Sequence, residues 1–448
     1  MVTSKEAPVS EKRYSAPESC VPKGYKQTDV GMIPEEWSTA HLPDVVWYQE
    51  GPGVRNYQFT SAGVKLFNGT NIENGKICLD KTSRYISERE ANGWYSHFLA
   101  DAGDIVIACS GITVSRFDEK VGVLSSEHLP LCMNTSTMRF KIASPLLNKD
   151  YFKHFLRSQL FKDQISGKAT GSAQLNFGPA HVRAALLPLP TKAEQEAIAQ
   201  ALSDADALIE SLDQLITKKR QIKQGAMQDL LTGKKRLPQF EIKPGYKQAE
   251  VGVIPKDWEV RPLLAAVRIA QGQVDPKMEP YKSMFLVGPV HVESGTGNLV
   301  TRQTAGEQGA ISGKYLFAEG DIVYGKINPY LRKAFLADFS GLCSADMYPL
   351  KPAKDVSSGF MLAVILGHQF TKYAESVSVR SGMPKINRVE MSEFVFPIPS
   401  DKAEQSAIAT ILSDMDDDIA ALEKKLAKIR QIKRGMMQEL LTGRTRLV

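Results

Sequence analysis

Two stretches of this 448-residue chain repeat each other without a gap. Residues 192–237 and 402–447 align at a fixed offset of 210, with 27 identities in 46 positions. A shorter repeat opens each half, because residues 24–37 (GYKQTDVGMIPEEW) match residues 245–258 (GYKQAEVGVIPKDW) at 9 of 14 positions. The blocks between the repeats are not recognisably alike. Two near-identical frames around two different inserts indicate one task done twice, on two different targets.

The long repeats carry the start and stop signals of helices. Proline pairs end the segment before each repeat, Thr191 and Asp401 can cap a helix, and a Glu three residues after each fits a capping box. Both copies end in Leu-Thr-Gly, and glycine is the usual left-handed residue just past a helix. The sequence therefore predicts two helices of about 40 residues, roughly 60 Å long at 1.5 Å per residue, followed by left-handed Gly233 and Gly443.

Apolar residues in both helices recur at alternating steps of four and three, which is the coiled-coil pattern. In the first copy the seam is Ile198, Leu202, Ala205, Ile209, Leu212 and Ile216, and it breaks at Lys219. In the second copy it is Ile408, Leu412, Met415, Ile419, Leu422, Leu426 and Ile429. We expect the two helices to pair antiparallel, because near-identical seams are mutually complementary. The alternative is that each helix packs only on its own domain.

Composition is that of an ordinary globular protein, with 43% hydrophobic and 24% charged residues. The net charge of +6 is compatible with a polyanionic partner without requiring one. The polar residues 1–20 predict a flexible tail and not a secretory signal. The chain has no apolar run near the length of a membrane span. Five cysteines without CxxC spacing argue against a disulfide framework or a zinc site and fit a reducing cytoplasm.

The two variable blocks share an order of elements. Short apolar runs after glycine turns, at residues 104–108 and 321–324, predict buried strands. Helical stretches follow at 150–165 and 359–375, and both blocks then reach a glycine turn, at 171–176 and 382–387. We interpret each block as an α+β domain of one fold.

The repeated KAEQ helix, the GYKQ opener, the GDIV strand, the KINPYLRK stretch (residues 326–333) and the glycine turn together resemble the specificity subunits of Type I restriction–modification systems. The resemblance covers nearly the whole chain after its first 20 residues. It implies two target-recognition domains, each of which reads one half of a split sequence in double-stranded DNA. It also implies that the two helices form a spacer and dock two methylation subunits, which restriction subunits then join.

From this resemblance we expect an α+β fold with two pseudo-twofold-related target-recognition domains, separated by two long antiparallel coiled-coil helices. The expected segments are a tail (1–20), a first recognition domain (21–190), a first spacer helix (191–237), a second recognition domain (238–399) and a second spacer helix (400–448). The chain itself is expected to be non-catalytic. S-adenosylmethionine, ATP and magnesium would be used by the partner subunits.

The residues themselves support no catalytic site. Asn328-Pro329-Tyr330 lacks one proline of the adenine-methyltransferase motif, and no glycine-rich S-adenosylmethionine loop follows a strand at a suitable distance. Gly309 to Lys314 is one residue short of a phosphate loop, and Tyr315 stands where Ser or Thr would hold magnesium. Two other functions remain to be weighed against DNA recognition: a self-contained methyltransferase or nuclease, and a coiled-coil adaptor that binds proteins without reading DNA.

Base edges are read by basic, amide and hydroxyl side chains on loops. In the first block the candidates are Arg55, Asn56, Tyr57, Gln58, Ser110, Thr113, Ser115, Arg116, Lys168, Ser172, Gln174 and Asn176. In the second block they are Lys326, Asn328, Tyr330, Arg332, Lys333, Arg380, Ser381, Lys385, Asn387 and Arg388. Each is also open to a simpler interpretation, as an exposed loop residue or an internal hydrogen-bonding group.

For partner docking we expect exposed residues on the outer faces of the helices, where two equivalent faces can hold two copies of one partner. The candidates are Glu194 and Gln195 in the first helix and Glu404 and Gln405 in the second.

Overall fold

The computed structural model describes residues 21–166, 174–240, 245–378 and 382–447. The chain forms two compact units: unit 1 comprises residues up to 210 together with 427–448, and unit 2 comprises residues 211–426. Each long repeat is one unbroken helix, α6 (Lys192–Leu231) or α11 (Lys402–Leu440). Each helix therefore begins in one unit and ends in the other.

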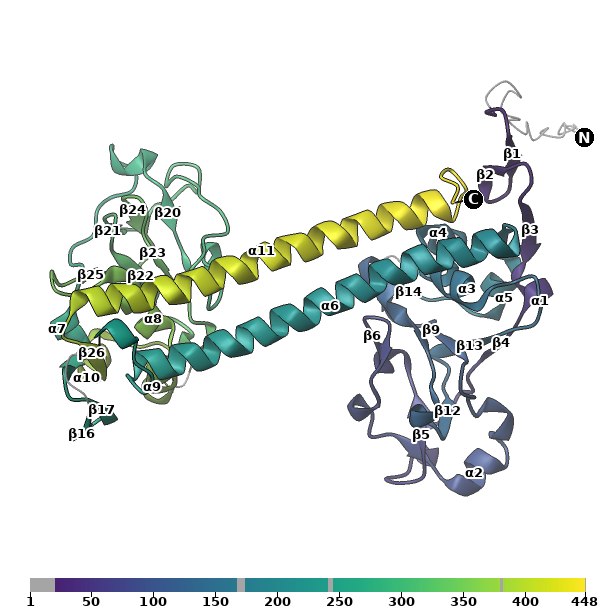
Figure 1. Cartoon of the computed structure of the whole chain (residues 1–448), viewed down its shortest axis with the longest axis horizontal. Coiled ribbons are helices and arrows are strands. Elements are labelled where there is room, and N and C mark those ends of the chain that lie inside the picture. The colour runs from purple at the N-terminus through teal and green to yellow at the C-terminus, as the bar shows by residue number, and fades with distance from the viewer. Residues whose placement is uncertain (1–20, 167–173, 241–244, 379–381, 448) are drawn as a thin grey trace, which may run out of the picture. The chain divides into compact units, whose positions relative to one another are not determined.

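Unit 1 is built on a four-stranded antiparallel sheet in the order β11-β9-β13-β4. Figure 1 labels three of these strands, β9, β13 and β4. Its strands are β4 (Val46–Glu50), β9 (Ile105–Ala108), β11 (Val121–Val123) and β13 (Thr137–Ile142). All four residues of β9 are buried, which explains its continuous apolar run. The helices that follow are α3 (Lys149–Leu156), α4 (Gln159–Ser166) and α5 (Pro179–Ala184). Phe140 of the sheet packs against Phe152 of α3, edge to face at 5.5 Å between ring centroids.

A smaller sheet completes unit 1. Its central strand β5 (Val64–Phe67) is parallel to β12 (Leu131–Met133) and antiparallel to β8 (Tyr85–Ile86). This sheet, with η2 (Asn56–Gln58) and α2 (Glu88–Asn92), has a hydrophobic core of its own. We call it the small lobe of unit 1.

Unit 2 repeats the main sheet of unit 1 strand for strand. Its main sheet has the order β23-β22-β25-β19. The strands are β19 (Val267–Ile269), β22 (Ile322–Gly325), β23 (Ala334–Leu336) and β25 (Met347–Pro352), and the helices are α8 (Ser358–Leu366), α9 (His368–Ser378) and α10 (Arg388–Glu393). The prediction of one α+β fold for both blocks is confirmed.

The units differ in the small sheet. In unit 2, β20 (Leu286–Val287) is parallel to β24 (Gly341–Cys343), as β5 is to β12. The third strand β21 (Tyr315–Phe317), however, pairs with β24, whereas β8 pairs with β5. The main sheet is thus shared, and the divergence lies in the connections around the small sheet.

The openers are hairpins, and the segment after each opener closes its domain. β1 (Tyr25–Thr28) pairs with β2 (Gly31–Pro34), and β16 (Tyr246–Ala249) pairs with β17 (Gly252–Pro255). Then β3 (Ser38–His41) pairs with β15 (Leu186–Leu189), and β18 (Trp258–Pro262) pairs with β26 (Val395–Pro399). Both β15 and β26 lie just before a long helix, so each block enters its helix from a strand that is fastened to the start of the block.

The two long helices run antiparallel in each unit. In unit 1, Ile198 and Leu202 of α6 share one hydrophobic core with Met437 and Leu440 of α11. In unit 2, Leu230 and Leu231 of α6 share a core with Ile408 and Leu412 of α11. The start of one helix therefore lies beside the end of the other, as the complementary seams predicted. The alternative that each helix packs only on its own domain is wrong.

Ion pairs replace the apolar seam where it breaks at Lys219. In unit 2, Lys219 Nζ lies 2.9 Å from Asp418 Oδ2, and Lys223 pairs with Asp416. The equivalent pair at the 210-residue offset, Lys433 with Asp206, forms in unit 1. These lysines and aspartates are therefore contacts between the helices, and not only solvated charges.

Two local predictions need correction. The stretches 150–165 and 359–375 each form two helices, because Ser158 Oγ accepts a hydrogen bond from Phe161 N at 3.2 Å and α8 ends at Gly367. Only one half of each predicted capping box forms, the hydrogen bond that the cap side chain accepts. Thr191 caps α6 by accepting from Glu194 N at 3.3 Å, and Asp401 caps α11 by accepting from Ala403 N at 2.8 Å. The carboxylates of the two Glu residues, however, bind elsewhere. The left-handed glycines are confirmed, with φ of 69° at Gly233 and 70° at Gly443.

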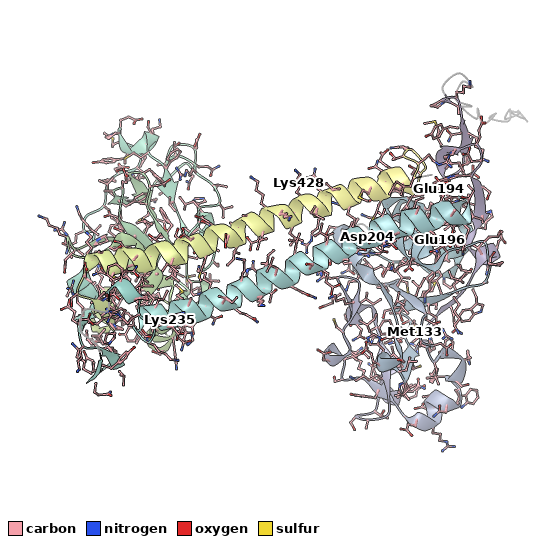
Figure 2. All side chains as sticks on the ribbon, in the orientation of Figure 1. Met133, Glu194, Glu196, Asp204, Lys235 and Lys428 are labelled. Carbon is pink, nitrogen blue, oxygen red and sulfur yellow. The ribbon has the colours of Figure 1, made fainter. Side chains whose placement is uncertain are left out.

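The carboxylate of Glu194 joins three parts of the repeat frame in unit 1. It accepts from Trp37 Nε1 at 2.9 Å and from Arg446 Nη2 at 2.8 Å, and Arg446 also lies 5.7 Å above the Trp37 ring. Figure 2 places Glu194 at the start of α6. We call this set the Trp–Glu–Arg anchor of unit 1. It ties the opener, the start of α6 and the segment after α11 together.

Unit 2 has the same anchor. Glu404 accepts from Trp258 Nε1 at 3.2 Å and from Arg236 Nε at 2.8 Å. Arg236 also binds both carboxylate oxygens of Asp257, at 2.8 and 3.0 Å. All anchor residues lie in the repeats, which gives a physical reason for their near-identity.

Candidate nucleic-acid interface

In unit 1 the loop after β9 meets residues 174–176, the part of the predicted glycine turn that the structure describes. β10 (Ile112–Thr113) pairs with β14 (Gln174–Leu175), so that Thr113 stands opposite Gln174. Asn176 Oδ1 accepts from Ser110 Oγ at 3.1 Å and from Gly111 N at 2.7 Å. Two candidate sets are thus brought together, as Ser110 and Asn176 are 66 positions apart, and the Asn176 oxygen is engaged in holding them.

The remaining candidates of this loop are exposed. Thr113, Ser115 and Arg116 lie on or beside η6 (Val114–Lys120). Arg116 Nε donates to Glu119 Oε2 at 2.7 Å, and both side chains keep much solvent contact. An exposed pair of this kind contributes little to stability, so the guanidinium can exchange this partner for a phosphate or a base at small cost. Lys168 and Ser172 lie outside the described residues.

Arg55, Asn56, Tyr57 and Gln58 lie in the small lobe of unit 1. Figure 1 shows two elements of this lobe, β5 and α2, away from β14. The Gln58 amide is engaged internally, since its Nε2 donates to Glu90 Oε1 and to Tyr95 Oη, both at 3.0 Å. Tyr57 is the opposite case, with 87% of its surface exposed. The structure therefore separates this set from the loop after β9.

Unit 2 brings together the equivalent loops. The loop after β22 bridges to the second glycine turn, with Ile327 opposite Lys385. Asn328 N donates to Pro384 O at 2.8 Å, and Ile386 N donates to Lys326 O at 3.0 Å. Two blocks without recognisable sequence likeness thus place the same pair of loops at the same edge of the main sheet.

Two cations of this edge share one aromatic ring. Lys326 Nζ lies 4.8 Å and Arg388 Cζ lies 5.5 Å from the centroid of Tyr348, distances typical of cation–π contacts. Burial raises the pKa of Tyr348 above its ordinary value. Arg388 also donates to Ala270 O at 3.0 Å. The ring therefore orders two positive charges beside the exposed Lys385.

The tip of the β22–β23 loop has unusual backbone. Asn328 and Arg332 adopt left-handed φ values of 50° and 47° on either side of η11 (Pro329–Leu331). Asn tolerates this conformation, whereas Arg adopts it at a cost, and strained positions of this kind concentrate at functional sites. Tyr330 lies between these two residues and has 56% of its surface exposed.

Two candidates in unit 2 have internal roles. Lys333 Nζ donates to Pro289 O at 2.7 Å and to Val292 O at 2.9 Å. Asn387 caps α10, since its Oδ1 accepts from Glu390 N at 2.9 Å and its N–H donates back to Glu390 Oε2 at 2.7 Å. Both side chains position backbone. Arg380 and Ser381 lie outside the described residues.

The expectation that the docking candidates are exposed is wrong. Glu194 and Gln195 have no exposed surface, and Glu404 and Gln405 are 3% and 1% exposed. The glutamates form the two anchors. Gln195 Oε1 accepts from Asn148 N at 2.8 Å, as Gln405 Oε1 accepts from Ser357 N at 2.8 Å, so each glutamine fastens a helix to the domain before it. These four residues are too enclosed to bind a partner.

Sequence reasoning missed the Trp–Glu–Arg anchors, although a signal was present. Trp37, Glu194 and Arg446 each have an identical counterpart at the same place in the other repeat. Polar and aromatic identities in a repeat, beyond what a helical seam needs, point to a shared contact.

Within the described ranges, no group of three or more His, Cys, Asp or Glu side chains is placed to hold a metal ion. None of the helices described there is long and apolar enough to span a lipid bilayer.

Comparison with known proteins agrees with this architecture. The chain matches the family model of the Type I restriction modification DNA specificity domain twice, over residues 34–222 and 255–433. It is 27% identical over 442 residues to the Type I restriction enzyme EcoDI specificity subunit of Escherichia coli, covering 92% of this chain and 89% of the relative. It is 26% identical over 436 residues to the putative type I restriction enzyme MjaX specificity subunit of Methanocaldococcus jannaschii, covering 95% and 97%.

Two solved structures share the fold. The S subunit of the Type I restriction–modification system from M. genitalium aligns with a TM-score of 0.52 at 15% identity, over 90% of this chain and 96% of that chain. A chain from a study of complex assembly and conformational transition of the type I R-M system aligns with a TM-score of 0.52 at 14% identity, over 92% and 99%. With two family matches that together cover most of its length, this chain belongs to the Type I restriction modification DNA specificity family.

Proposed function

We propose that this chain is the DNA-reading specificity subunit of a Type I restriction–modification complex, and that each unit reads one half of a bipartite target. The observation that carries the proposal is the recurrence of one loop pair on two unlike blocks. The loop after β9 joins β14 in unit 1, and the loop after β22 joins the glycine turn in unit 2. A shared frame with different loop residues is what two readers of different sequences require.

Candidates for DNA contact are the side chains that stand on these loops or on the small lobe of unit 1. In unit 1 they are Arg55, Asn56, Tyr57, Thr113, Ser115, Arg116 and Gln174. In unit 2 they are Lys326, Asn328, Tyr330, Arg332, Lys385 and Arg388. The guanidinium and ammonium groups suit guanine or phosphate, and the amides suit adenine. Lys168, Ser172, Arg380 and Ser381 stay predictions from sequence.

The chain has no catalytic role in this proposal. Adenine methylation would be performed by two methylation subunits, and ATP-dependent cleavage by restriction subunits that join them. S-adenosylmethionine, ATP and magnesium would be bound by those partners. This chain contributes the base contacts and the helices that hold its two readers.

For docking of the methylation subunits, exposed apolar residues of the helices replace the four buried candidates. Ile222 of α6 and Ile432 of α11 take the same position in the two repeats and are 51% and 45% exposed. Equivalent exposed positions on two related helices suit two copies of one partner. Figure 2 shows Lys428 of α11 pointing away from α6, which marks a face of α11 that is open to a partner. Ile222→Asp and Ile432→Asp should each remove one methylation subunit from the complex, as measured by native mass spectrometry.

The experiment that tests DNA reading maps methylated adenines in a host that expresses this chain with its methylation subunit. We expect one motif in two parts with a fixed gap. Lys385→Ala should relax or weaken only the half-site that unit 2 reads, by about 1–3 kcal/mol if it contacts a base. Lys351→Ala is the matched control, because Lys351 is an exposed lysine at the opposite end of strand β25.

Other outcomes would overturn the proposal in distinct ways. A continuous motif would mean that only one unit reads DNA. Equal weakening of both half-sites by Lys385→Ala would contradict two independent readers. A complex that assembles with its partner but neither methylates nor binds DNA would favour the protein-adaptor function.

A further inference from the structure

Each unit contains a short turn that is built alike from unlike residues. Residues 68–75 (NGTNIENG) and 288–295 (GPVHVESG) share only Glu and Gly when aligned. Both nevertheless form a 3-10 turn, η3 (Gly69–Asn71) or η10 (Pro289–His291), closed by a side chain that accepts from the backbone three residues earlier. Asn71 Oδ1 accepts from Asn68 N at 2.9 Å, and His291 Nδ1 accepts from Gly288 N at 3.0 Å.

A lysine from the candidate DNA loop holds each turn. Lys120 Nζ donates to Gly69 O at 3.3 Å and to Ile72 O at 2.6 Å. Lys333 Nζ donates to the equivalent carbonyls, Pro289 O at 2.7 Å and Val292 O at 2.9 Å. We call residues 68–75 and 288–295, each held by its lysine, the braced turns.

A glycine closes the far end of each braced turn in the same way. Gly75 N donates to Glu119 O at 2.8 Å, and Gly295 N donates to Arg332 O at 3.0 Å. Both glycines have a φ of 75°, a left-handed value that favours glycine. A Cβ added to Gly295 would stand 2.8 Å from the guanidinium of Arg332, so this turn also supports that side chain.

The braced turns lie at the edge of the sheet that carries the candidate DNA loops. A Cβ on Gly69 would come within 2.9 Å of the Cβ of Ala108, the last residue of β9. Lys333 O accepts from Gly325 N, the last residue of β22, at 2.7 Å. The turn of unit 1 therefore contacts the strand end from which its candidate loop departs, and in unit 2 the lysine that braces the turn pairs with the equivalent strand end.

The tip of each braced turn is exposed and differs between the units. Thr70 is exposed in unit 1, and Val290 has 77% of its surface exposed in unit 2. Val300, whose N–H donates to His291 O at 2.8 Å, is 65% exposed beside it. The braced turn of unit 2 thus holds an exposed apolar side chain, Val290, beside the candidate DNA loop, where contact with water does not stabilise it.

We propose that the braced turns are a further DNA-reading element, in which Thr70 and Val290 are specificity-determining residues and Lys120 and Lys333 are positioning residues. This inference rests on the proposed function. Val290 has the chemistry to pack on the 5-methyl group of a thymine in the major groove, which is the apolar feature that distinguishes thymine there. Thr70 combines a methyl group with a hydroxyl and can contact either a thymine methyl or a polar base edge.

The test measures binding of the complex of this chain and its methylation subunit to a duplex that contains the mapped bipartite target. Thymines are replaced one at a time by deoxyuracil, which removes only the methyl group. At one thymine in the half-site of unit 2, the wild-type complex should bind about three- to fivefold more weakly, the value of one buried methyl group. Val290→Ala should weaken binding to the thymine duplex by a similar factor and remove the sensitivity to deoxyuracil. Thr70→Ala should leave that half-site unchanged.

Lys333→Met separates a positioning role from phosphate contact. If Lys333 only positions the turn, this change should remove the deoxyuracil sensitivity and leave the salt dependence of binding unchanged. If Lys333 instead bound a phosphate, Lys333→Met should reduce the salt slope of binding by about 1. Because Val290 is on the surface, its substitution keeps the test valid even if Lys333→Met perturbs folding.

Two results would overturn the inference. One is a Val290→Ala complex that binds every duplex as the wild type does. The other is loss of a methylation subunit in that variant with DNA binding unchanged, which would assign the valine to a protein contact. Failure of the proposed function is distinguishable, because the wild-type complex would then show no preference for the bipartite duplex at all.

Discussion

Replacing Arg446 by alanine should loosen the end of α11 from unit 1. Arg446 makes two hydrogen bonds to Glu194, whose side chain has no exposed surface. Removing it leaves a buried carboxylate with the Trp37 indole N–H as its remaining anchor partner. Loss of one partner of a buried pair costs about 3–5 kcal/mol. The Arg446 site itself is 27% exposed, so water can reach the carboxylate, and we expect the lower end, about 3 kcal/mol.

Hydrogen exchange read by mass spectrometry can measure this effect in each unit separately. A loss of about 3 kcal/mol corresponds to roughly 100-fold more frequent opening. Amides near the end of α11 and in the segment around Trp37 should exchange faster by about that factor, while those of unit 2 should not change. Arg236→Ala should produce the mirror-image result, with faster exchange confined to unit 2.

Two further variants make the reasoning refutable. Arg444→Ala removes an exposed arginine two residues away whose nearest carboxylate, Glu439, is 3.6 Å distant and also exposed, so it should cost less than about 0.5 kcal/mol. Adding Glu194→Gln to Arg446→Ala should recover part of the loss, because the unpaired buried charge disappears. If Arg446→Ala behaved like Arg444→Ala, or if Glu194→Gln gave no recovery, the buried-charge account of the anchor would be wrong.

Three further predictions concern a buried histidine, the ion pairs between the helices, and two glycines. Burial lowers the pKa of His154 to about 3, from an ordinary 6.5, because burial disfavours the protonated imidazole. Unit 1 therefore has its full stability above about pH 6.5 and loses stability as the pH decreases. Urea unfolding at pH 5 should show unit 1 less stable by about 2 kcal/mol, and His154→Gln should remove that loss. Lys223→Met should destabilise unit 2 by about 1 kcal/mol, because the Lys223 side chain is only 14% exposed. Arg220→Met should cost less than about 0.5 kcal/mol, because the Arg220 side chain is 64% exposed. The urea midpoints of the two variants measure this difference. Gly225→Ala should stabilise α6 by about 0.5–1 kcal/mol, because nothing obstructs a Cβ there. Gly233→Ala should destabilise unit 2, because its Cβ would stand 2.5 Å from Pro255 at a left-handed φ. The midpoint temperature of thermal unfolding should rise for the first variant and fall for the second.

Much of the architecture follows from the sequence because its causes are local or repeated. Capping residues, a 4-3 apolar pattern and a terminal Leu-Thr-Gly are enough to predict α6 and α11, since each signal acts within one or two turns. The apolar runs at 105–108 and 322–324 predict β9 and β22 for the same reason. The repeats add a non-local fact, because two complementary seams indicate that the helices pair. Contact of individual candidate residues with DNA stays a prediction.

Only the tertiary structure decided which of the polar candidate residues are exposed and which are engaged inside the protein. Glu194 and Gln195 were expected on an outer face, yet Glu194 meets residues 157 and 252 positions away in the chain, and Gln195 meets Asn148. Lys333 was expected to reach DNA, yet its ammonium braces a turn more than 40 residues earlier. A side chain's spacing along a helix or loop defines the direction in which it points. Its burial depends on which distant segment packs there, and nothing in its immediate sequence specifies that segment.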